Sequence, residues 1–337
     1  MRKSLKIIGK LLVALAVLGI TGYFLFIYEK PVDQQAMDKF LMGQPVIDVH
    51  IHVSKGFDSN DVYGSDLKSG PKLDHAKLNW FKNAFDKHNI VIGLSGGPVQ
   101  HVMNWMKEDN RFWGGVSFPY NELNEADEPF VNEFLTYEEL FVLYDSIGFR
   151  SMGESMYMYY GIHPHDERLD AYWKIAQEFK IPIGIHADGP PPPWMRDKKT
   201  SHLINKEYSN PELLRPILAK YPDLKLILFH FCGIYSDEAI QLMKDYPNVY
   251  CDISAVSYFM PKIFWEGAVK KLFKEGLGDR LLFGSDYMTF IRGHIEAIYS
   301  IDWLTEKDKR DILYNNAAEF LELTTEEINQ HHQSVKN

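Results

Sequence analysis

The chain has 337 residues and an ordinary globular composition, with 45% hydrophobic and 24% charged residues and a net charge of −10. An acidic chain repels phosphate backbones, so nucleic acid is not an expected partner. Its two cysteines, Cys232 and Cys251, are too few and too isolated for a disulfide framework or a thiolate zinc site.

The first predicted element is a membrane helix within residues 1–30. Four basic residues precede the uncharged run Leu11–Tyr28, whose 18 residues are just enough to span a bilayer. The basic flank predicts a cytoplasmic N-terminus and an extracytoplasmic remainder. We expect an uncleaved signal anchor, because the run ends in large side chains without an A-x-A site. A cleaved signal peptide, which would release a secreted protein, is the alternative.

After a lead-in over 31–44, short apolar runs alternate with helical patterns. The runs predict eight strands, at Val46–Val53, Ile90–Leu94, Trp113–Phe118, Gly148–Gly153, Pro182–His186, Lys225–His230, Val249–Ile253 and Arg280–Gly284. Helical patterns between them include Leu73–Lys87, Tyr137–Ser146, Glu167–Phe179, Pro211–Lys220 and Glu238–Lys244. This alternation predicts an α/β fold, a (β/α)8 TIM barrel. An open doubly wound sheet is the alternative, but no glycine-rich phosphate loop follows the first strand.

Two long polar segments interrupt the regular spacing. Lys55–Pro71 follows the first predicted strand and Gly189–Ser209 follows the fifth. In a (β/α)8 barrel, chemistry takes place at the C-terminal ends of the strands. Both segments are therefore candidates for substrate contact, with plain surface insertion as the alternative.

Candidate metal ligands stand on the first strand and at the ends of later strands. Side chains alternate along a strand, so His50 and His52 point the same way and can chelate one divalent ion. Asp48 shares their face but lies deeper, as expected of a structural group or one that orients a ligand. Further candidates at the ends of strands four, five, six and eight are Glu154, His186, His230 and Asp286.

This arrangement resembles the amidohydrolase superfamily. The sequence RLLFGSDYM at 280–288 resembles the last-strand signature of its amidohydrolase-related (amidohydrolase 2) branch, and DILYNNAAEFLEL at 311–323 resembles the helix that closes that barrel. The resemblance covers residues 45–323 and leaves 324–337 as a polar C-terminal tail.

The resemblance implies a role for each candidate ligand. His50, His52 and Asp286 would hold one metal, and His186 and His230 would bind a second metal or orient the substrate. FRSMGES places Glu154 like a glutamate of TatD-like nucleases, which favours a bridge between two ions, whereas many single-metal members lack such a bridge. Zinc is the ion expected first, with manganese or another divalent ion as alternatives.

The implied function is hydrolysis of a small ester, lactone, amide or phosphoester by water that the metal activates. Asp286 would accept and return the proton. Candidate substrate contacts are His163, His165, Trp194 and Arg196. The expected partners are a small-molecule substrate and the membrane, and homo-oligomer formation stays open. Alternatives are a single-metal decarboxylase, a TatD-like nuclease and an inactive metal-binding surface protein.

Overall fold

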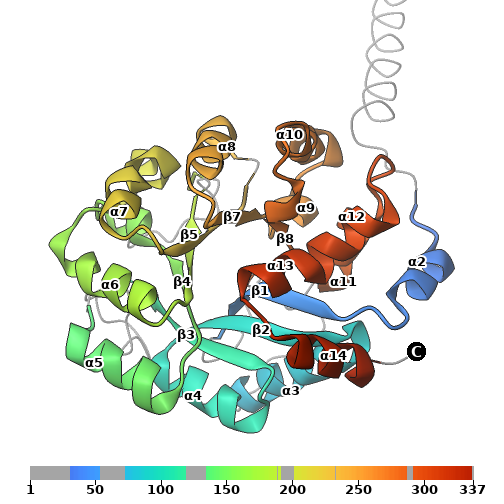
Figure 1. The fold of residues 1–337 in the computed structure, drawn as a ribbon, viewed down its shortest axis with the longest axis horizontal. Coiled ribbons are helices and arrows are strands. Elements are labelled where there is room, and N and C mark those ends of the chain that lie inside the picture. The colour runs from blue at the N-terminus through green and yellow to red at the C-terminus, as the bar shows by residue number, and fades with distance from the viewer. Residues whose placement is uncertain are drawn as a thin grey trace, which may run out of the picture.

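Eight parallel strands form the centre of the molecule, each hydrogen-bonded to the next in chain order (Figure 1). The computed structural model describes residues 31–53, 73–118, 134–187, 189–190, 201–231, 233–286 and 291–335. The strands are β1 (Val46–His52), β2 (Ile90–Gly97), β3 (Phe112–Phe118), β4 (Ser151–Ser155), β5 (Pro182–His186), β6 (Lys225–Phe229), β7 (Val249–Asp252) and β8 (Leu281–Leu282). The predicted TIM barrel is confirmed.

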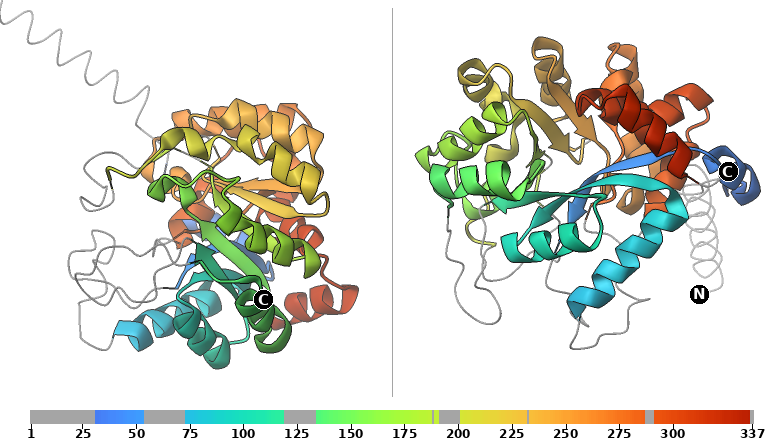
Figure 2. Two further views of the ribbon diagram at one scale, coloured as in Figure 1. Left: turned by 90° about the vertical axis from the view of Figure 1, so that its left-hand side faces the viewer. Right: turned by 60° about the horizontal axis from the view of Figure 1, so that its bottom comes forward.

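Helices cover the outside of this barrel (Figures 1 and 2). They are α2 (Gln34–Leu41), α3 (Leu73–His88), α4 (Val99–Glu108), α5 (Tyr137–Phe141), α6 (Asp170–Glu178), α7 (Arg215–Lys220), α8 (Ser236–Asp245), α9 (Val256–Phe259), α10 (Lys262–Lys274), α11 (Ile291–Tyr299), α12 (Glu306–Arg310), α13 (Asn316–Phe320) and α14 (Thr325–Ser334). Apolar side chains fill the space between helices and strands, as the alternation of strand and helix predicts.

The barrel closes between β1 and the chain that follows the short β8. The backbone N–H of Val49 donates to the carbonyl oxygen of Phe283 at 3.0 Å. Further along the same two segments, Ile51 and Asp286 form a parallel bridge. Closure therefore brings Asp286 beside the histidine pair of β1, although more than 230 residues separate them in sequence.

The lead-in over 31–44 is not a plain linker, because it contains α2. The side chain of Asp33 accepts hydrogen bonds from the N–H groups of Gln35 and Ala36, which caps the helix start. Met37 and Phe40 are buried against the core. The sequence pattern does not reveal this helix because it is only two turns long.

Strand β4 begins at Ser151, three residues later than predicted. Gly148 instead ends the preceding helical segment in the left-handed conformation, at φ 87°. Glycine favours this conformation because it has no Cβ. The shift places Glu154 inside β4 rather than just after it.

The segment predicted as a polar tail, 324–337, contains α14. Thr324 and Glu327 form a reciprocal capping box at its start, and Ile328 packs against the core. Within the part of the chain that the structure describes, no helix combines the length and apolar character needed to cross a bilayer. The predicted anchor lies in residues 1–30, outside the described residues.

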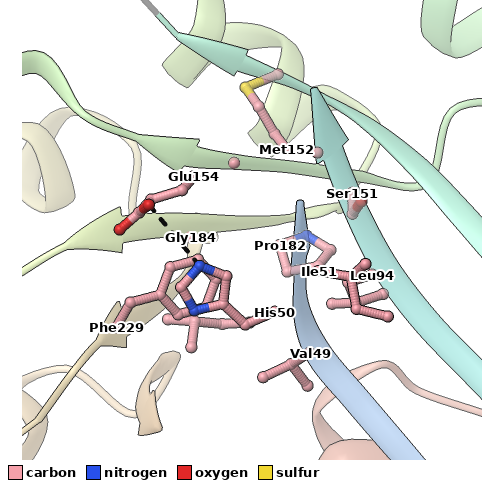
Figure 3. Close-up of a pocket in the computed structure, with 13 residues that line it drawn as sticks. Val49, His50, Ile51, Leu94, Ser151, Met152, Glu154, Pro182, Gly184 and Phe229 are labelled. Atoms are coloured by element: carbon pink, nitrogen blue, oxygen red, sulfur yellow. Dashed lines mark ion pairs between the residues drawn. The ribbon is translucent and has the colours of Figure 1, made fainter. Parts of the chain in front are cut away.

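Side chains fill the inside of the barrel beneath the candidate ligands (Figure 3). The cavity left there has a volume of only about 10 Å³, which is room for roughly one water molecule. The ring of Phe229 stacks under His50, with ring centroids 3.6 Å apart and planes inclined by 12°. This packed floor holds His50 from below and directs access to the open end of the barrel.

Candidate metal centre

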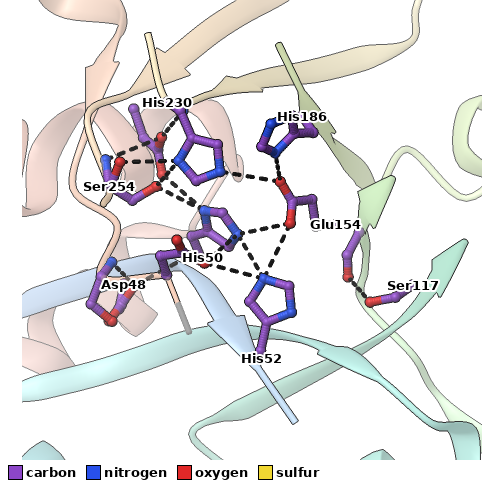
Figure 4. Close-up of polar contacts among 12 residues, drawn as sticks. Asp48, His50, His52, Ser117, Glu154, His186, His230 and Ser254 are labelled. Carbon is purple, nitrogen blue, oxygen red and sulfur yellow. Dashed lines mark hydrogen bonds and ion pairs between the residues drawn. The ribbon is translucent and has the colours of Figure 1, made fainter. Parts of the chain in front are cut away.

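The six candidate ligands converge at the C-terminal ends of the strands (Figure 4). Five of them are buried, and His52 is partly exposed. The histidine pair behaves as the alternation along β1 predicts, since the Nε2 atoms of His50 and His52 lie 3.2 Å apart. The cluster is therefore a compact, mostly dry set of imidazoles and carboxylates.

Glu154 lies at the centre of this cluster. Its Oε2 atom is 3.2 Å from His52 Nε2 and 3.8 Å from His50 Nε2. Its Oε1 atom is 2.7 Å from His186 Nδ1 and 3.2 Å from His230 Nε2. One carboxylate thus presents different oxygens to the histidines of β1 and to those of β5 and β6.

Asp286 completes the side of the cluster that faces β1. Its Oδ1 atom is 3.2 Å from His52 Nε2 and 3.5 Å from His50 Nε2. Four of the ligands, His50, Glu154, His230 and Asp286, each offer one atom within 4.8 Å of the others. This spacing suits a shared cation.

Hydrogen bonds to carbonyl groups define which histidine nitrogen is available. His230 Nδ1 lies 3.0 Å from the carbonyl oxygen of Ser254, and His186 Nε2 lies 3.2 Å from that of Gly189. A carbonyl only accepts, so these nitrogens carry protons in the neutral rings. The other nitrogen of each ring then directs its lone pair at Glu154. A lone pair and a carboxylate oxygen are both acceptors, so they repel each other unless a cation lies between them. The residues therefore fit a divalent metal with mixed imidazole and carboxylate ligands.

Asp252 and Ser254, at the end of β7, orient two of the ligands. Ser254 Oγ lies 2.8 Å from His50 Nδ1 and 3.2 Å from His230 Nδ1. Asp252 Oδ2 is 3.4 Å from His50 Nδ1, and its Oδ1 accepts the backbone N–H of His230 at 2.9 Å. Such contacts fix ring orientation and tautomer. We did not identify these two residues from sequence, although polar residues at the end of the seventh strand were the available signal.

Charge pairing outweighs burial in the cluster. Burial alone raises the pKa of Glu154, but its histidine neighbours, His186 first, hold it well below its usual value. Burial lowers the pKa of His230, but the hydrogen bond with Glu154 and the charge of Asp286 raise it to about 9. The carboxylates are therefore ionised and hold protons on neighbouring imidazoles when no metal is bound. A bound cation replaces those protons.

Two of the ligands adopt backbone conformations that are rare for residues with a side chain. His230 has φ 60° and Asp286 has φ 65°, both in the left-handed region. His230 directly follows β6, and Asp286 ends the extended segment that follows β8. A non-glycine residue there costs of order 1 kcal/mol or more, and such residues concentrate at functional sites. The surrounding barrel maintains both conformations.

Two of the predicted substrate contacts, His163 and His165, have described contacts with other neighbours, and the other two lie outside the described residues. The ring of His163 contacts those of His165 and Tyr208, and His165 Nε2 lies 2.6 Å from the carbonyl oxygen of Leu213. No hydrogen bond or ion pair described for either histidine reaches a candidate ligand. Trp194 and Arg196 fall in 191–200, outside the described residues. Substrate contact by all four stays a prediction.

Tyr159, in the short helical turn Tyr157–Tyr160 that follows β4, also reaches the cluster. Its hydroxyl lies 3.2 Å from His186 Nε2, and the two rings meet edge to face at 4.9 Å. Tyr159 is thus placed to orient His186 from the side opposite Glu154.

Residues 47–323 match the family model described as amidohydrolase, Amidohydro_2. The chain belongs to this amidohydrolase family. The matched region contains the barrel from the second residue of β1 onward and every candidate metal ligand, so the predicted resemblance is confirmed at the level of the family.

One curated relative of this amidohydrolase is Protein fluG of Emericella nidulans, which is 31% identical over 110 residues. That alignment covers 33% of the chain and 12% of fluG, so the chain spans about an eighth of its relative.

Similar solved structures share the barrel at low sequence identity. An uncharacterised TIM-barrel protein from Bordetella bronchiseptica is 19% identical, with a TM-score of 0.59 over 82% of this chain and 98% of that one. A probable 2-pyrone-4,6-dicarboxylic acid hydrolase from Acinetobacter baumannii is 15% identical, with a TM-score of 0.55 over 82% and 99%. The 5-carboxyvanillate decarboxylase LigW from Sphingomonas paucimobilis is 12% identical, with a TM-score of 0.52 over 83% and 100%. These likenesses show a common fold.

Proposed function

We propose that this amidohydrolase is a metal-dependent hydrolase that cleaves a small ester, lactone, amide or phosphoester. The observation that supports the proposal most strongly is the orientation of the Glu154 carboxylate. Its two oxygens face two separate groups of histidines, at 2.7–3.8 Å. A carboxylate in this position suits a bridge between two divalent ions, a common arrangement in hydrolytic metal sites.

The ligands divide into two groups around Glu154. His50 and His52 would hold one ion together with Asp286 and Glu154 Oε2, while His186 and His230 would hold the other together with Glu154 Oε1. Zinc suits this mixture of imidazole and carboxylate, and manganese is the alternative. Bound there, the ions supply Lewis acidity and make water acidic enough to ionise near neutral pH.

Asp286 is the proposed general base. Its carboxylate lies beside His50 and His52 at the open end of the barrel, and its pKa is lowered far below the usual range. Burial alone raises that pKa, but the charge of His50 and the other histidines outweighs it. An ionised carboxylate accepts a proton from the attacking water and returns it to the leaving group.

Metal content measured on the full-length chain, purified without chelator, tests this proposal first. About two ions per chain would support the Glu154-bridged hydrolase. One ion would shift support to single-metal chemistry. No ion, even after zinc and manganese are offered, would contradict an enzyme of this type.

Asp286→Asn tests the base. We expect hydrolysis of the substrate found by screening esters, lactones, amides and phosphoesters to fall by at least about 100-fold. The metal content of the variant must be measured alongside, because Asp286 is also a proposed ligand. Retained turnover with bound metal would remove Asp286 from the base role.

Single-metal decarboxylation is the second candidate function. It is supported by the compactness of His50, Glu154, His230 and Asp286, whose ligand atoms lie within 4.8 Å of one another and could surround one ion. Release of carbon dioxide from carboxylated aromatic compounds, with one ion per chain, would favour this function over hydrolysis.

We also propose that residues 1–30 anchor the barrel in a membrane, with the N-terminus in the cytoplasm. The uncharged run Leu11–Tyr28 and its basic flank support this placement. The full-length chain should stay with membranes after carbonate extraction, and protease added outside spheroplasts should digest the barrel. A chain found in the medium that begins after the apolar run would instead indicate secretion.

A further inference from the structure

Large apolar side chains are exposed mainly at the catalytic end of the barrel. Among the described residues, the exposed large hydrophobic side chains are Met42, Val142, Leu203, Ile234, Met260, Ile263 and Phe264. The last five lie in the segments that follow β5, β6 and β7, where the strands deliver the metal ligands. Met42 instead precedes β1 at the opposite end, and Val142 lies midway along the helical stretch 137–147 that leads to β4.

Three of these residues form one continuous feature, which we call the apolar rim: Met260, Ile263 and Phe264. They occupy the start of α10 and the turn before it, and they are 40%, 48% and 62% exposed. Figure 1 shows α10 beside α9, directly after β7. Exposed apolar side chains gathered in this way, next to polar neighbours such as Lys262, mark an interaction surface rather than scattered exposure.

The chain enters the barrel at the same end. The side chain of Gln34, the first residue of α2, donates to Glu296 at 2.7 Å and accepts from Arg292 at 2.5 Å. Arg292 also pairs with Asp38 at 2.8 Å. Gln34 therefore lies beside the first two turns of α11, which starts at Ile291, five residues after Asp286, and this places the start of α2 toward the catalytic end.

Chain length then limits how far that end can lie from the bilayer. Five peptide steps join Tyr28, the last residue of the apolar run, to Asp33, which caps α2. A fully extended chain covers roughly 3.5 Å per residue, so the two residues are at most about 18 Å apart. The end of the barrel opposite the metal centre can lie farther from the bilayer, because the length of α2 also separates it from Asp33.

We propose that the apolar rim rests on the bilayer that anchors the chain, so that the metal centre opens toward the membrane surface. This inference rests on the proposed anchor. Side chains such as Phe264 and Ile263 insert into the boundary between headgroups and acyl chains, as interfacial helices do. The site would then receive amphipathic substrates that collect at the bilayer surface, with the ester or amide group at the depth of the headgroups.

A spin label on the full-length chain in phosphatidylcholine–phosphatidylglycerol nanodiscs tests this orientation. The labelled variant is Phe264→Cys with Cys232→Ser, since Cys251 is buried and does not react. Val142→Cys in the same background is the matched control, because Val142 is also exposed, at 50%, but precedes β4. We expect the label at 264 to collide more often with oxygen than with a water-soluble nickel chelate, and the label at 142 to show the reverse.

Equal access of the nickel chelate to both labels would overturn the inference. Ile263→Cys supplies a second position with the same expected result, in case one side chain turns away. A chain that fails to enter nanodiscs would overturn both the anchor and the inference. The hydrolase proposal would be unaffected by either result, because metal content and turnover are measured separately.

Discussion

Ser285 donates both its hydroxyl and its backbone N–H to the carboxylate of Asp48, at 2.6 and 3.0 Å. Asp48 is fully buried on β1, and Ser285 follows β8, so the pair joins the first and last strands of the barrel. Burial raises the pKa of Asp48 to about 7, even though these hydrogen bonds lower it. Asp48 therefore closes the barrel beside the candidate metal centre and is not itself among the clustered candidate ligands.

Replacing Asp48 tests this structural role. Asp48→Ala leaves the backbone N–H groups of His50 and Ser285 without their acceptor in a buried place. We expect the free energy of unfolding, measured in urea on metal-free protein, to fall by about 3 kcal/mol. Asp48→Asn keeps one acceptor oxygen and should lose less than half as much. Equal losses in the two variants would show that charge, rather than hydrogen bonding, is what matters.

Acid should destabilise the metal-free protein through two buried histidines. Burial is the main reason that the pKa values of His88 and His294 are lowered to about 4, from the usual value near 6.5. Between these pH values the unfolded chain binds more protons than the folded chain, so stability is present above pH 6.5 and is lost as the pH falls toward 4. His230 contributes little to the pH dependence of stability between pH 4 and 6.5. Its pKa of about 9 keeps it protonated in the folded state, and its ordinary pKa near 6.5 keeps it mostly protonated in the unfolded chain as well.

Asp48 opposes this loss, because its raised pKa of about 7 lets the folded chain bind an extra proton in the same pH range. Urea unfolding at pH 6.5, 5.5 and 4.5 should therefore show a net loss of only about 1–3 kcal/mol. His88→Gln should flatten the slope, because it removes one of the two groups. An unchanged slope in this variant would assign the acid sensitivity to other residues.

Ser254→Ala should weaken metal binding while leaving the barrel folded. The hydroxyl of Ser254 contacts the Nδ1 atoms of both His50 and His230. Loss of a group that orients metal ligands typically reduces metal affinity by about 10- to 100-fold. Competition with a chromophoric chelator measures the change. The control is Ser257→Ala, whose hydroxyl lies 2.8 Å from His294 Nδ1, and equal effects of both variants would contradict the assignment.

Gly184→Ala should disturb the floor of the metal centre. A Cβ at this position would lie 2.1 Å from the ring of Phe229, which stacks under His50. The ring must move, so we expect about 1–3 kcal/mol of destabilisation in urea and weaker metal binding. Gly267→Ala is the matched control, because no atom lies within 4 Å of its Cβ and alanine favours the helix. Metal binding unaffected by Gly184→Ala would show that Phe229 does not position His50.

Much of the fold and the identity of the ligands could be predicted before the structure. Eight apolar runs separated by helical patterns indicate the barrel, and the alternation along β1 places His50 and His52 on one face. Helix α2 was missed because two turns carry a weak periodic signal. The start of β4 was misplaced because Gly148 reads equally well as the beginning of a strand or the end of a helix.

The orienting residues could not be predicted in the same way. Ser254 contacts His50 across 204 positions of the sequence, and no local pattern encodes that distance. Phe229 reads as an ordinary apolar strand residue, yet barrel closure places its ring under the candidate metal ligand His50. Both contacts depend on which strands become neighbours.

The sequence alone determined the family, the strand order and the residue types at the candidate metal centre, because these follow from side-chain period and from motifs local to each strand. Only the tertiary structure decided that the two oxygens of Glu154 face different histidines, and that the first residue of α2 lies beside α11. Such relations depend on distances across the barrel. Those distances follow from closure of the sheet and packing of the helices, which bring together residues that local chemistry cannot relate.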